Sequence, residues 1–328
     1  MKSNNIKSIG VLTSGGDSPG MNAAIRAVVR GAIYNGLQVY GIKQGYQGLV
    51  DNDMVEMQSH SVSNIIQHGG TILKTARCMD FMSAEGRKKA HENLQSRGID
   101  ALVTIGGDGT FAGAQVFGDE FSFPIIGIPG TIDNDICGTD YTIGYDTALN
   151  TVVEAVDKIR DTASAHNRLF FIEVMGRNAG FLTLHGGIAT GTEAIMVPEI
   201  TDDYDMLNVF LDSAHKKHKT SSIVLVAEGD ELGGAIKIAE KVRQEHPEYD
   251  VRVTILGHIQ RGGSPTAIDR INAGRMGVSA VEALLDGKKD VMVGLMNGKI
   301  VTSPFSRAKK EKRPLDEQLL DLIEILSI

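Results

Sequence analysis

Three short stretches of the sequence combine glycine with acidic or hydroxyl side chains, a combination that suits a phosphorylated ligand. They are residues 14–20, 106–110 and 130–135. Glycine has no side chain, so backbone N–H groups beside it can approach phosphate oxygens directly. A carboxylate among such glycines can also bind a hard cation such as Mg²⁺. These stretches are therefore the first candidates for the chemistry of this chain.

The first stretch reads Ser-Gly-Gly-Asp-Ser-Pro-Gly and could offer the N–H groups around Gly15 and Gly16 to phosphate. It is not a Walker A loop, because no Gly-Lys-Ser/Thr follows, and its glycine spacing does not fit a dinucleotide fingerprint. A tight turn between a strand and a helix explains it equally well.

The second stretch, Gly-Gly-Asp-Gly-Thr, places Asp108 among glycines. Asp108 could hold Mg²⁺ through one oxygen or through water while the metal bridges phosphates. The alternative is that Asp108 is the N-cap of the following helix. Position alone does not separate these two interpretations.

The third stretch contains Asp133 and Asp135, two residues apart. In an extended loop their side chains point the same way, and mutual repulsion raises the pKa of one of them. Asp133 would then suit the acceptance of a hydroxyl proton, with Asp135 supporting a metal or the loop. An Asx-turn rich in Asp and Asn is the alternative.

Several arginines stand near the ends of predicted strands or helices: Arg77, Arg168, Arg177, Arg252 and Arg261. Guanidinium groups suit phosphate oxygens, and each charged contact contributes about 1.5–3 kcal/mol. A single arginine in a loop is usually only solvated, whereas several at strand ends favour anion recognition. His258 taken alone is more typical of a structural histidine.

The elements that must position these residues follow a repeated pattern of an apolar run, a glycine-rich turn and an amphipathic segment. The pattern predicts strands at 9–13, 101–105, 124–128, 170–175, 223–227 and 251–256. Strands that alternate with helices predict an α/β fold, with two Rossmann-like three-layer α/β/α domains whose sheets are mainly parallel. In such sheets ligands bind at the carboxyl ends of the strands.

Helices are predicted from periodicity and from end signals. Residues 21–35 follow the first glycine-rich turn, and in 151–163 the apolar side chains fall on one face. Ser83 begins a polar helix that ends at Gly98, with a plausible cap at each end.

The length of 328 residues suits two domains. No Pro/Ser linker marks the boundary between the two domains. We place the points at which the chain passes from one domain to the other near Ile143 and Ile259. The larger domain would comprise 1–143 and 259–308. The smaller domain would comprise 144–258 and 309–328.

Composition excludes several classes of function. The hydrophobic fraction of 42% and the charged fraction of 23% are those of a soluble globular protein. The net charge of −8, the absence of Trp and the aromatic fraction of 5% argue against a nucleic-acid partner. No apolar run could cross a membrane, and the first residues leave no room for a signal peptide. Cys78 and Cys137 are not spaced as metal ligands, so a cytoplasmic location is expected.

Together these sequence segments closely resemble the bacterial-type ATP-dependent 6-phosphofructokinase family. The resemblance runs from Ile9 to about Arg313, and its most specific pieces are 13–22, 105–110, 129–138, 173–177 and 256–265. It implies transfer of the γ-phosphoryl group of ATP to the 1-hydroxyl of fructose 6-phosphate, giving fructose 1,6-bisphosphate and ADP, the committed step of glycolysis. It also implies that the larger domain binds ATP, that the smaller domain binds the sugar phosphate, and that Mg²⁺ is the cofactor, bound by Asp108.

The resemblance implies a role for each matched residue on the nucleotide side. Gly16 would donate a backbone N–H to the phosphates, Tyr46 would lie beside the nucleotide, and Arg77 would neutralise charge between the β- and γ-phosphates. The predicted nucleotide-binding residues are Gly16, Tyr46, Arg77, Cys78, Gly107, Asp108, Gly109 and Thr110.

On the acceptor side, the resemblance makes Asp133 the base for the sugar hydroxyl, with Arg77, Thr131 and Arg177 as the other catalytic residues. The predicted substrate-binding residues are Thr131, Ile132, Asp133, Arg168, Met175, Gly176, Arg177, Glu228, Arg252, His258, Ile259, Gln260 and Arg261. In the family the residues at Arg168 and Arg252 reach across a subunit interface to the 6-phosphate. A homotetramer is therefore implied.

Two glycines predict the phosphoryl donor. Pyrophosphate-dependent relatives carry Asp at the position of Gly109 and Lys at the position of Gly130, and those side chains would occupy the space of the α-phosphate. Glycine at both positions leaves the space open for ATP.

The resemblance also implies an allosteric anion site for ADP or phosphoenolpyruvate. The residues that fit it are Arg26, Arg30, Arg160, Gly191, Thr192, Glu193 and Lys219. Asp53 and Thr220 depart from the pattern, and an aspartate near an anion pocket weakens it electrostatically.

Two rival functions share part of these signals. Another kinase with the same Gly-Gly-Asp-Gly-Thr loop, such as an NAD or lipid kinase, would lack 131–135 and 258–261. A catalytically silent sensor of nucleotide or sugar phosphate is the second rival, and the presence of both Asp108 and Asp133 argues against it.

Overall fold

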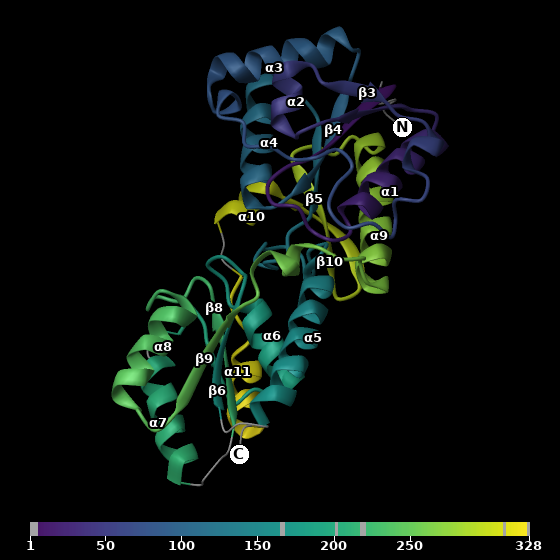
Figure 1. Cartoon of the computed structure of the whole chain (residues 1–328). Helices are drawn as coiled ribbons and strands as arrows, with labels where there is room; N and C mark the ends of the chain where they lie inside the picture. The colour runs from purple at the N-terminus through teal and green to yellow at the C-terminus, as the bar shows by residue number, and fades with distance from the viewer. Residues whose placement is uncertain (1–5, 165–167, 201–202, 217–220, 311–312, 327–328) are drawn as a thin grey trace. The chain divides into compact units, whose positions relative to one another are not determined.

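The computed structural model describes residues 6–164, 168–200, 203–216, 221–310 and 313–326. The chain forms two compact units, each with a sheet of its own (Figure 1). The first unit comprises 1–132, 136–147 and 261–313, and the second comprises 133–135, 148–260 and 314–328.

The first unit is built on a seven-stranded sheet in the order β11-β10-β5-β4-β1-β2-β3. Its strands are β1 (Ser8–Thr13), β2 (Gln38–Ile42), β3 (Met54–Glu56), β4 (Ala101–Gly106), β5 (Ile125–Pro129), β10 (Val291–Met296) and β11 (Lys299–Pro304). The five strands from β10 to β2 are parallel, and only β3 and β11 at the two edges run antiparallel to their neighbours. All residues of β1, β4 and β5 are buried, as expected of central parallel strands covered on both faces.

Helices cover both faces of this sheet (Figure 1). They are α1 (Met21–Tyr34) and α9 (Ala267–Leu285) on one face, and α2 (Tyr46–Asp51), α3 (Ala84–Ser96), α4 (Asp108–Phe121) and α10 (Phe305–Lys310) on the other. Short 3₁₀ helices η1 (Ser59–Val62) and η2 (Asp80–Met82) lie in the loops. Alternation along β1 divides the core, because Ile9 and Val11 pack under α1 whereas Leu12 packs with α2 and α4.

The second unit contains a four-stranded parallel sheet in the order β7-β8-β6-β9. Its strands are β6 (Arg168–Val174), β7 (Ala194–Met196), β8 (Ser222–Ala227) and β9 (Asp250–Ile255). One face packs against α7 (Asp203–Lys216) and α8 (Gly234–Glu245). On the other face Gly186 of α6 (Phe181–Thr190) lies against Val152 of α5 (Tyr145–Ser164) and Leu225 of β8.

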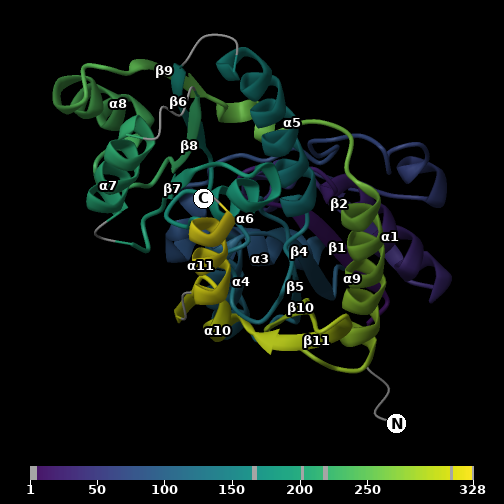
Figure 2. The ribbon, with the colours of Figure 1, turned by 90° about the horizontal axis from the view of Figure 1, so that it is seen from below.

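The last helix, α11 (Glu317–Leu326), packs beside α6 in this unit (Figure 2). The 3₁₀ helix η3 (Gly257–Arg261) follows β9 directly. Edge strand β9 is largely exposed on the face that carries Asp250 and Arg252.

The predicted α/β fold is confirmed, and so are the six predicted strands and the helices at α1, α3 and α5. Ser83 caps α3 as predicted, since its side chain accepts a hydrogen bond from the N–H of Gly86 at 3.0 Å. Strands β2, β3, β7, β10 and β11 were not among those predicted from the sequence; of these, β3 and β7 have only 3 residues each, and β3, β7 and β11 are edge strands.

Candidate functional site

The three glycine-rich turns lie together at the carboxyl ends of neighbouring strands β1, β4 and β5 of the first unit. The N–H of Ser14 donates to the carbonyl of Ile105 at 3.0 Å, and the N–H of Gly130 donates to the carbonyl of Gly106 at 3.0 Å. Each bond joins one turn to the strand beside it. These turns therefore share one edge of the sheet, the edge at which ligands bind in parallel α/β sheets.

Thr110 and Tyr46 fix the second turn. The hydroxyl of Thr110 donates to the carbonyl of Ser14 at 3.1 Å, and the Tyr46 hydroxyl donates to the carbonyl of Thr110. A Cβ atom at Gly106 would lie 2.3 Å from the Thr110 hydroxyl, so only glycine fits there. Burial raises the pKa of the Tyr46 hydroxyl well above its ordinary value. Tyr46 is thus a neutral hydrogen-bond donor beneath the turn.

The first turn depends on two glycines with left-handed backbone, Gly15 at φ 86° and Gly20 at φ 104°. Arg261 packs against this turn. Its Nη1 donates to the carbonyl of Asp17 at 3.2 Å, and a Cβ atom at Gly16 would lie 2.5 Å from the same nitrogen. A guanidinium group therefore lies beside the backbone that was predicted to bind phosphate.

Asp108 is the first residue of α4, and the N-cap of this helix is Gly107. The alternative in which Asp108 caps the helix is therefore wrong. Asp108 and Gly109 are exposed. A Cβ atom at Gly109 would meet no atom within 4 Å, which leaves open space in front of this carboxylate turn. A negative charge here also interacts favourably with the N-terminal end of α4.

Arg77 is exposed and Cys78 is half-buried, just before η2. Cys78 packs against the apolar cluster that contains Tyr46 and Phe81, and this burial raises the pKa of its thiol. The Phe81 ring stacks on the Tyr46 ring with 4.1 Å between their centroids.

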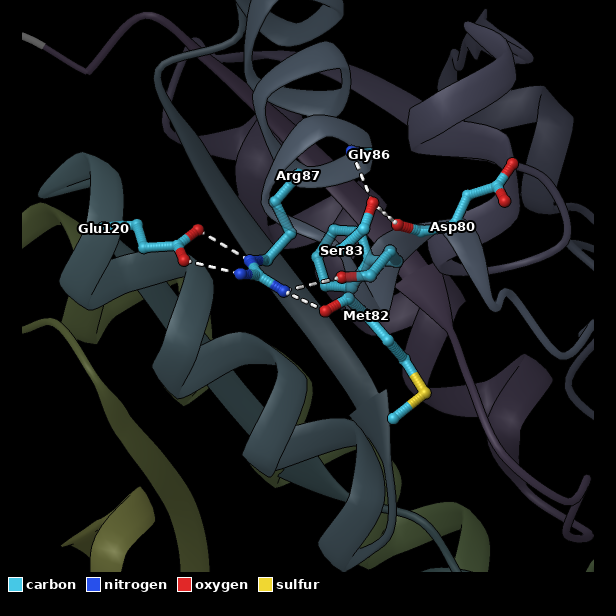
Figure 3. A network of polar contacts seen from close by, with 7 residues as sticks. Asp80, Met82, Ser83, Gly86, Arg87 and Glu120 are labelled. Atoms are coloured by element: carbon cyan, nitrogen blue, oxygen red, sulfur yellow. Dashed lines mark hydrogen bonds and ion pairs between the residues drawn. The ribbon is translucent and has the colours of Figure 1, made fainter.

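The segment after Arg77 is held by a polar network around Arg87 (Figure 3). Arg87 forms two 2.6 Å bonds to the carboxylate of Glu120 on α4. Its Nη1 also donates to the carbonyls of Phe81 and Met82, at 3.1 and 2.7 Å. Helices α3 and α4 thus fix η2, which limits where Arg77 can lie.

The third turn differs from its prediction. Asn134 has a left-handed backbone with φ 53°, so the segment is not uniformly extended. The alternation that was expected to point Asp133 and Asp135 the same way therefore does not hold. Thr131 and Asp133 are buried, at 9% and 8% exposure. The carbonyl of Thr131 accepts a 2.6 Å bond from the hydroxyl of Thr142.

The two glycines that predicted the phosphoryl donor differ in their surroundings, since a Cβ atom at Gly109 would have open space around it and one at Gly130 would not. A Cβ atom at Gly130 would point at the side chains of Ile105 and Met21, at 3.1 and 3.3 Å. A larger residue there would have to displace core atoms rather than fill open space.

In the second unit, one group of predicted residues gathers where β6, β8 and β9 end. Glu228 accepts bonds from the N–H groups of Arg177 and Gly176, at 2.7 and 3.4 Å. Gly176 has φ 149° and Arg177 has φ 57°, so this carboxylate holds a sharply turned backbone. The N–H of Met175 donates to Oε1 of the fully buried Gln260 at 3.2 Å. His258 and Ile259, in η3, are exposed.

Arg168 and Arg252 form a second group at the opposite, amino ends of β6 and β9. Nε of Arg168 donates to Oδ2 of Asp250 at 3.0 Å, and Nη2 of Arg252 donates to the same oxygen at 3.1 Å. Arg168 is therefore a full strand length from the carboxyl ends of the strands, where η3 follows β9, whereas Arg252 is the third of the six residues of β9.

Within the second unit, the predicted effector residues Arg160 and Glu193 lie beside the turn at Gly191 and Thr192. Arg160 donates to the carbonyls of Thr190 and Gly191, at 2.9 and 3.0 Å, and its Nη1 lies 3.6 Å from Glu193. Thr192 lies buried in the same turn. Arg26 and Arg30 lie on α1 of the first unit, where burial and the neighbouring Arg30 charge lower the pKa of Arg26. Lys219 and Thr220 lie outside the described residues.

Sequence reasoning missed several buried carboxyl groups. Asp269 of α9 accepts bonds from the N–H groups of Gly144 and Thr147, at 2.8 and 2.9 Å, and ties α9 to the start of α5. Asp203 and Asp230 are hydrogen-bonded to each other, and burial and the Asp230 charge raise the pKa of Asp203 to about 7. No local motif marks these positions, because their partners lie far away in the sequence.

The sequence of this chain is similar to those of known proteins. A family model described as Phosphofructokinase matches residues 8–284. The chain is 59% identical over 323 residues to ATP-dependent 6-phosphofructokinase 2 of Bacteroides thetaiotaomicron, covering 98% of this chain and 99% of that protein. It is 53% identical to ATP-dependent 6-phosphofructokinase 1 of Thermus thermophilus, covering 98% of this chain and 100% of that protein.

Solved structures give the same relationship. Phosphofructokinase from Saccharomyces cerevisiae superposes with a TM-score of 0.87 at 38% identity, over 98% of this chain and 47% of the yeast chain. A pyrophosphate-dependent phosphofructokinase from Marinobacter aquaeolei superposes with a TM-score of 0.83, over 98% of this chain and 91% of that one. At 21% identity the second likeness concerns the fold alone.

Proposed function

Because the chain belongs to the phosphofructokinase family, we propose that it is an ATP-dependent 6-phosphofructokinase. It transfers the γ-phosphoryl group of ATP to the 1-hydroxyl of fructose 6-phosphate and releases fructose 1,6-bisphosphate and ADP. The observation that carries this proposal is the 59% identity over nearly the whole length to a protein named for that activity.

The nucleotide site of this proposal is the set of turns after β1 and β4. N–H groups at Gly16 and at the start of α4 bind phosphate oxygens, which suits the amino end of a helix. The open space at Gly109 supports a nucleoside triphosphate as donor. Arg77 neutralises charge that develops between the β- and γ-phosphates.

Mg²⁺ fits the donor set of this site. The ion takes one or two carboxylates together with phosphate oxygens and water, and exposed Asp108 supplies one carboxylate. Across the described ranges, no group of three or more His, Cys, Asp or Glu side chains could hold a metal ion without the nucleotide. When bound, the ion would offset phosphate charge.

The chemical step in this proposal is an in-line transfer that depends mainly on positioning and charge. Asp133 accepts the proton of the sugar 1-hydroxyl, while Thr131 and Arg177 contact the transferred group. The burial of Thr131 and Asp133 supports this role, because it limits the access of water that would compete with the sugar. Ile132, Met175, Gly176 and Glu228 hold the body of the sugar.

Binding of the 6-phosphate supports an assembly of more than one copy. β6 is 7 residues long, so at about 3.3 Å per residue its two ends lie roughly 20 Å apart. Arg168 begins β6 and Met175 follows its last residue, so one second unit holds these two predicted sugar-phosphate residues a full strand length apart, and Asp250, which bonds both Arg168 and Arg252, lies beside Arg168. In the proposed homotetramer, Arg168 and Arg252 bind the 6-phosphate held by His258 and Arg261 of another copy.

Regulation by ADP or phosphoenolpyruvate is also proposed, at Arg26, Arg30, Arg160 and Glu193 with the turn at Gly191 and Thr192. The joint placement of Arg160 and Glu193 supports a site there. A cytoplasmic location is proposed as well. Among the helices that the structure describes, none is long and apolar enough to cross a membrane.

A donor titration tests the proposal. The purified chain is given fructose 6-phosphate with ATP, pyrophosphate or ADP in turn, each with Mg²⁺, and the sugar bisphosphate is measured. Formation with ATP alone is expected, whereas formation with pyrophosphate alone would contradict the donor assignment.

A further inference from the structure

Asp250 stands between the two arginines of the second unit that are proposed to bind the 6-phosphate. It begins edge strand β9 and is paired in register with Arg168 on β6. Arg252 follows two residues later, so its side chain leaves β9 on the same face. The three charged residues therefore form one cluster at the sheet edge, two cations around one anion.

The bonding pattern leaves the phosphate-binding atoms of both arginines available. Arg168 uses Nε toward Asp250 and Arg252 uses Nη2, at 3.0 and 3.1 Å. Within the described part of the chain, no other hydrogen bond holds these two guanidinium groups, which leaves both terminal nitrogens of Arg168 and the Nη1 and Nε atoms of Arg252. A guanidinium anchored at one nitrogen keeps a fixed plane and still presents a fork to an anion.

The negative charge of Asp250 also affects the repulsion between the two arginines. Two guanidinium groups close enough to share one phosphate repel each other, and an anion between them offsets that repulsion before the substrate arrives. The hydrogen bond from Arg168, together with Arg252, holds the pKa of Asp250 below its ordinary value, so the carboxylate is charged at neutral pH. The side chains of Arg168, Asp250 and Arg252 are 27%, 47% and 51% exposed, which leaves the cluster accessible to a ligand.

We propose that Asp250 is a positioning residue for the sugar-phosphate site, which aligns Arg168 and Arg252 for the 6-phosphate without touching the substrate. This inference rests on the proposed function. It differs from a purely structural role, in which charges on an exposed edge strand only prevent unwanted strand pairing.

The test compares Asp250→Asn with the wild-type protein in steady-state kinetics. The asparagine keeps the shape but loses the charge, so the KM for fructose 6-phosphate should rise by roughly five- to twenty-fold. The KM for ATP and kcat should stay within about two-fold. Asp250→Glu, which keeps the charge, should recover most of the affinity. Glu154→Gln, which removes a more exposed ion pair with Lys158 in the same unit, is the control for loss of a surface carboxylate and should behave as wild type.

Binding of fructose 6-phosphate, followed by calorimetry without ATP, should weaken by the same factor in Asp250→Asn. An unchanged or lowered KM for fructose 6-phosphate in that variant would overturn the inference, since Asp250 would then be neutral or a competitor of the phosphate. A wild-type protein that does not phosphorylate fructose 6-phosphate would instead overturn the proposed function, and this inference with it.

Discussion

The hydroxyl of Thr110 donates to the carbonyl of Ser14 at 3.1 Å and thereby joins the turn after β4 to the turn after β1. The two residues are 96 positions apart in sequence, and both belong to glycine-rich stretches. The carbonyl of Thr110 in turn accepts the Tyr46 hydroxyl. One short side chain therefore sets the spacing of the two turns that are proposed to bind the nucleotide phosphates.

Thr110→Val should weaken both stability and nucleotide binding. Loss of a buried hydrogen bond lowers the free energy of unfolding by about 1–3 kcal/mol. The KM for ATP should rise, while the KM for fructose 6-phosphate changes little. Thr110→Ser keeps the hydroxyl and is the matched control. A valine variant with the wild-type KM for ATP would show that the bond does not position the phosphate site.

Asp133→Asn should fold normally but lose about 10²–10⁴-fold in kcat, because the amide cannot accept the hydroxyl proton. Calorimetric binding of fructose 6-phosphate should be retained. Asp135→Asn, close by in the same turn, should lose much less. Equal losses in the two variants would remove the assignment of Asp133 as the base.

Gly109→Asp tests the choice of phosphoryl donor. Since a Cβ atom there meets nothing within 4 Å, the variant should fold with wild-type thermal stability. Its carboxylate would repel the nucleotide phosphates, and the KM for ATP should rise at least ten-fold, which is about 1.4 kcal/mol. Gly109→Ala serves as the control for loss of glycine and should change the KM much less. A wild-type KM in the aspartate variant would place the nucleotide elsewhere.

Arg252→Ala should raise the KM for fructose 6-phosphate far more than the KM for ATP, because the lost contact is to the 6-phosphate. Arg97→Ala, at a surface of the first unit where Arg97 bonds Asn52, is the control. A parallel rise in both KM values would contradict the assignment of Arg252 to the 6-phosphate.

Assemblies that contain both Asp133→Asn and Arg252→Ala chains test whether the base and the arginine pair of one site come from different copies. Asp133→Asn chains retain Arg252, and Arg252→Ala chains retain the base. If each site takes its base and its arginine pair from different copies, then unfolding and refolding a mixture should restore turnover. Restoration to a fraction of the wild-type rate is expected. Activity no higher than the sum of the two separate variants would contradict the shared site.

Asp203 should make stability depend on pH. Burial and the Asp230 charge raise its pKa from 3.8 to about 7, so the folded state holds a proton that the unfolded state releases near pH 4. The contribution of this carboxyl to stability is therefore complete below about pH 4 and declines as the pH rises to about 7. Urea unfolding from pH 4 to 8 should show that decline in the wild-type protein, and Asp203→Asn should remove it. An identical pH profile in the two proteins would contradict the raised pKa of Asp203.

Much of the fold was predictable because its central strands are mostly apolar and lead into glycine-rich turns. β1 and β4 are of this kind, and their turns proved to be neighbours. β7 has only 3 residues and β11 is a partly exposed edge strand, so neither produces a recognisable pattern.

The site was predictable at the level of single residues but not of contacts between distant ones. The turn at Gly16 was found from glycine alone, whereas its neighbour Arg261 is packed there by the tertiary fold. The bend at Asn134 was missed because a left-handed residue in a polar loop is not visible from the alternation of aspartates. Asp250 is recognisable only once β6 and β9 are known to be paired in register.

Phosphorus-31 NMR of the reaction mixture tests the central claim most directly. The purified chain is incubated with ATP, Mg²⁺ and fructose 6-phosphate, and the resonances of the products are followed with time. Growth of a second phosphomonoester signal on the sugar, equal in amount to the ADP formed, is the predicted result. Consumption of ATP without a sugar bisphosphate, or no consumption at all, would contradict it.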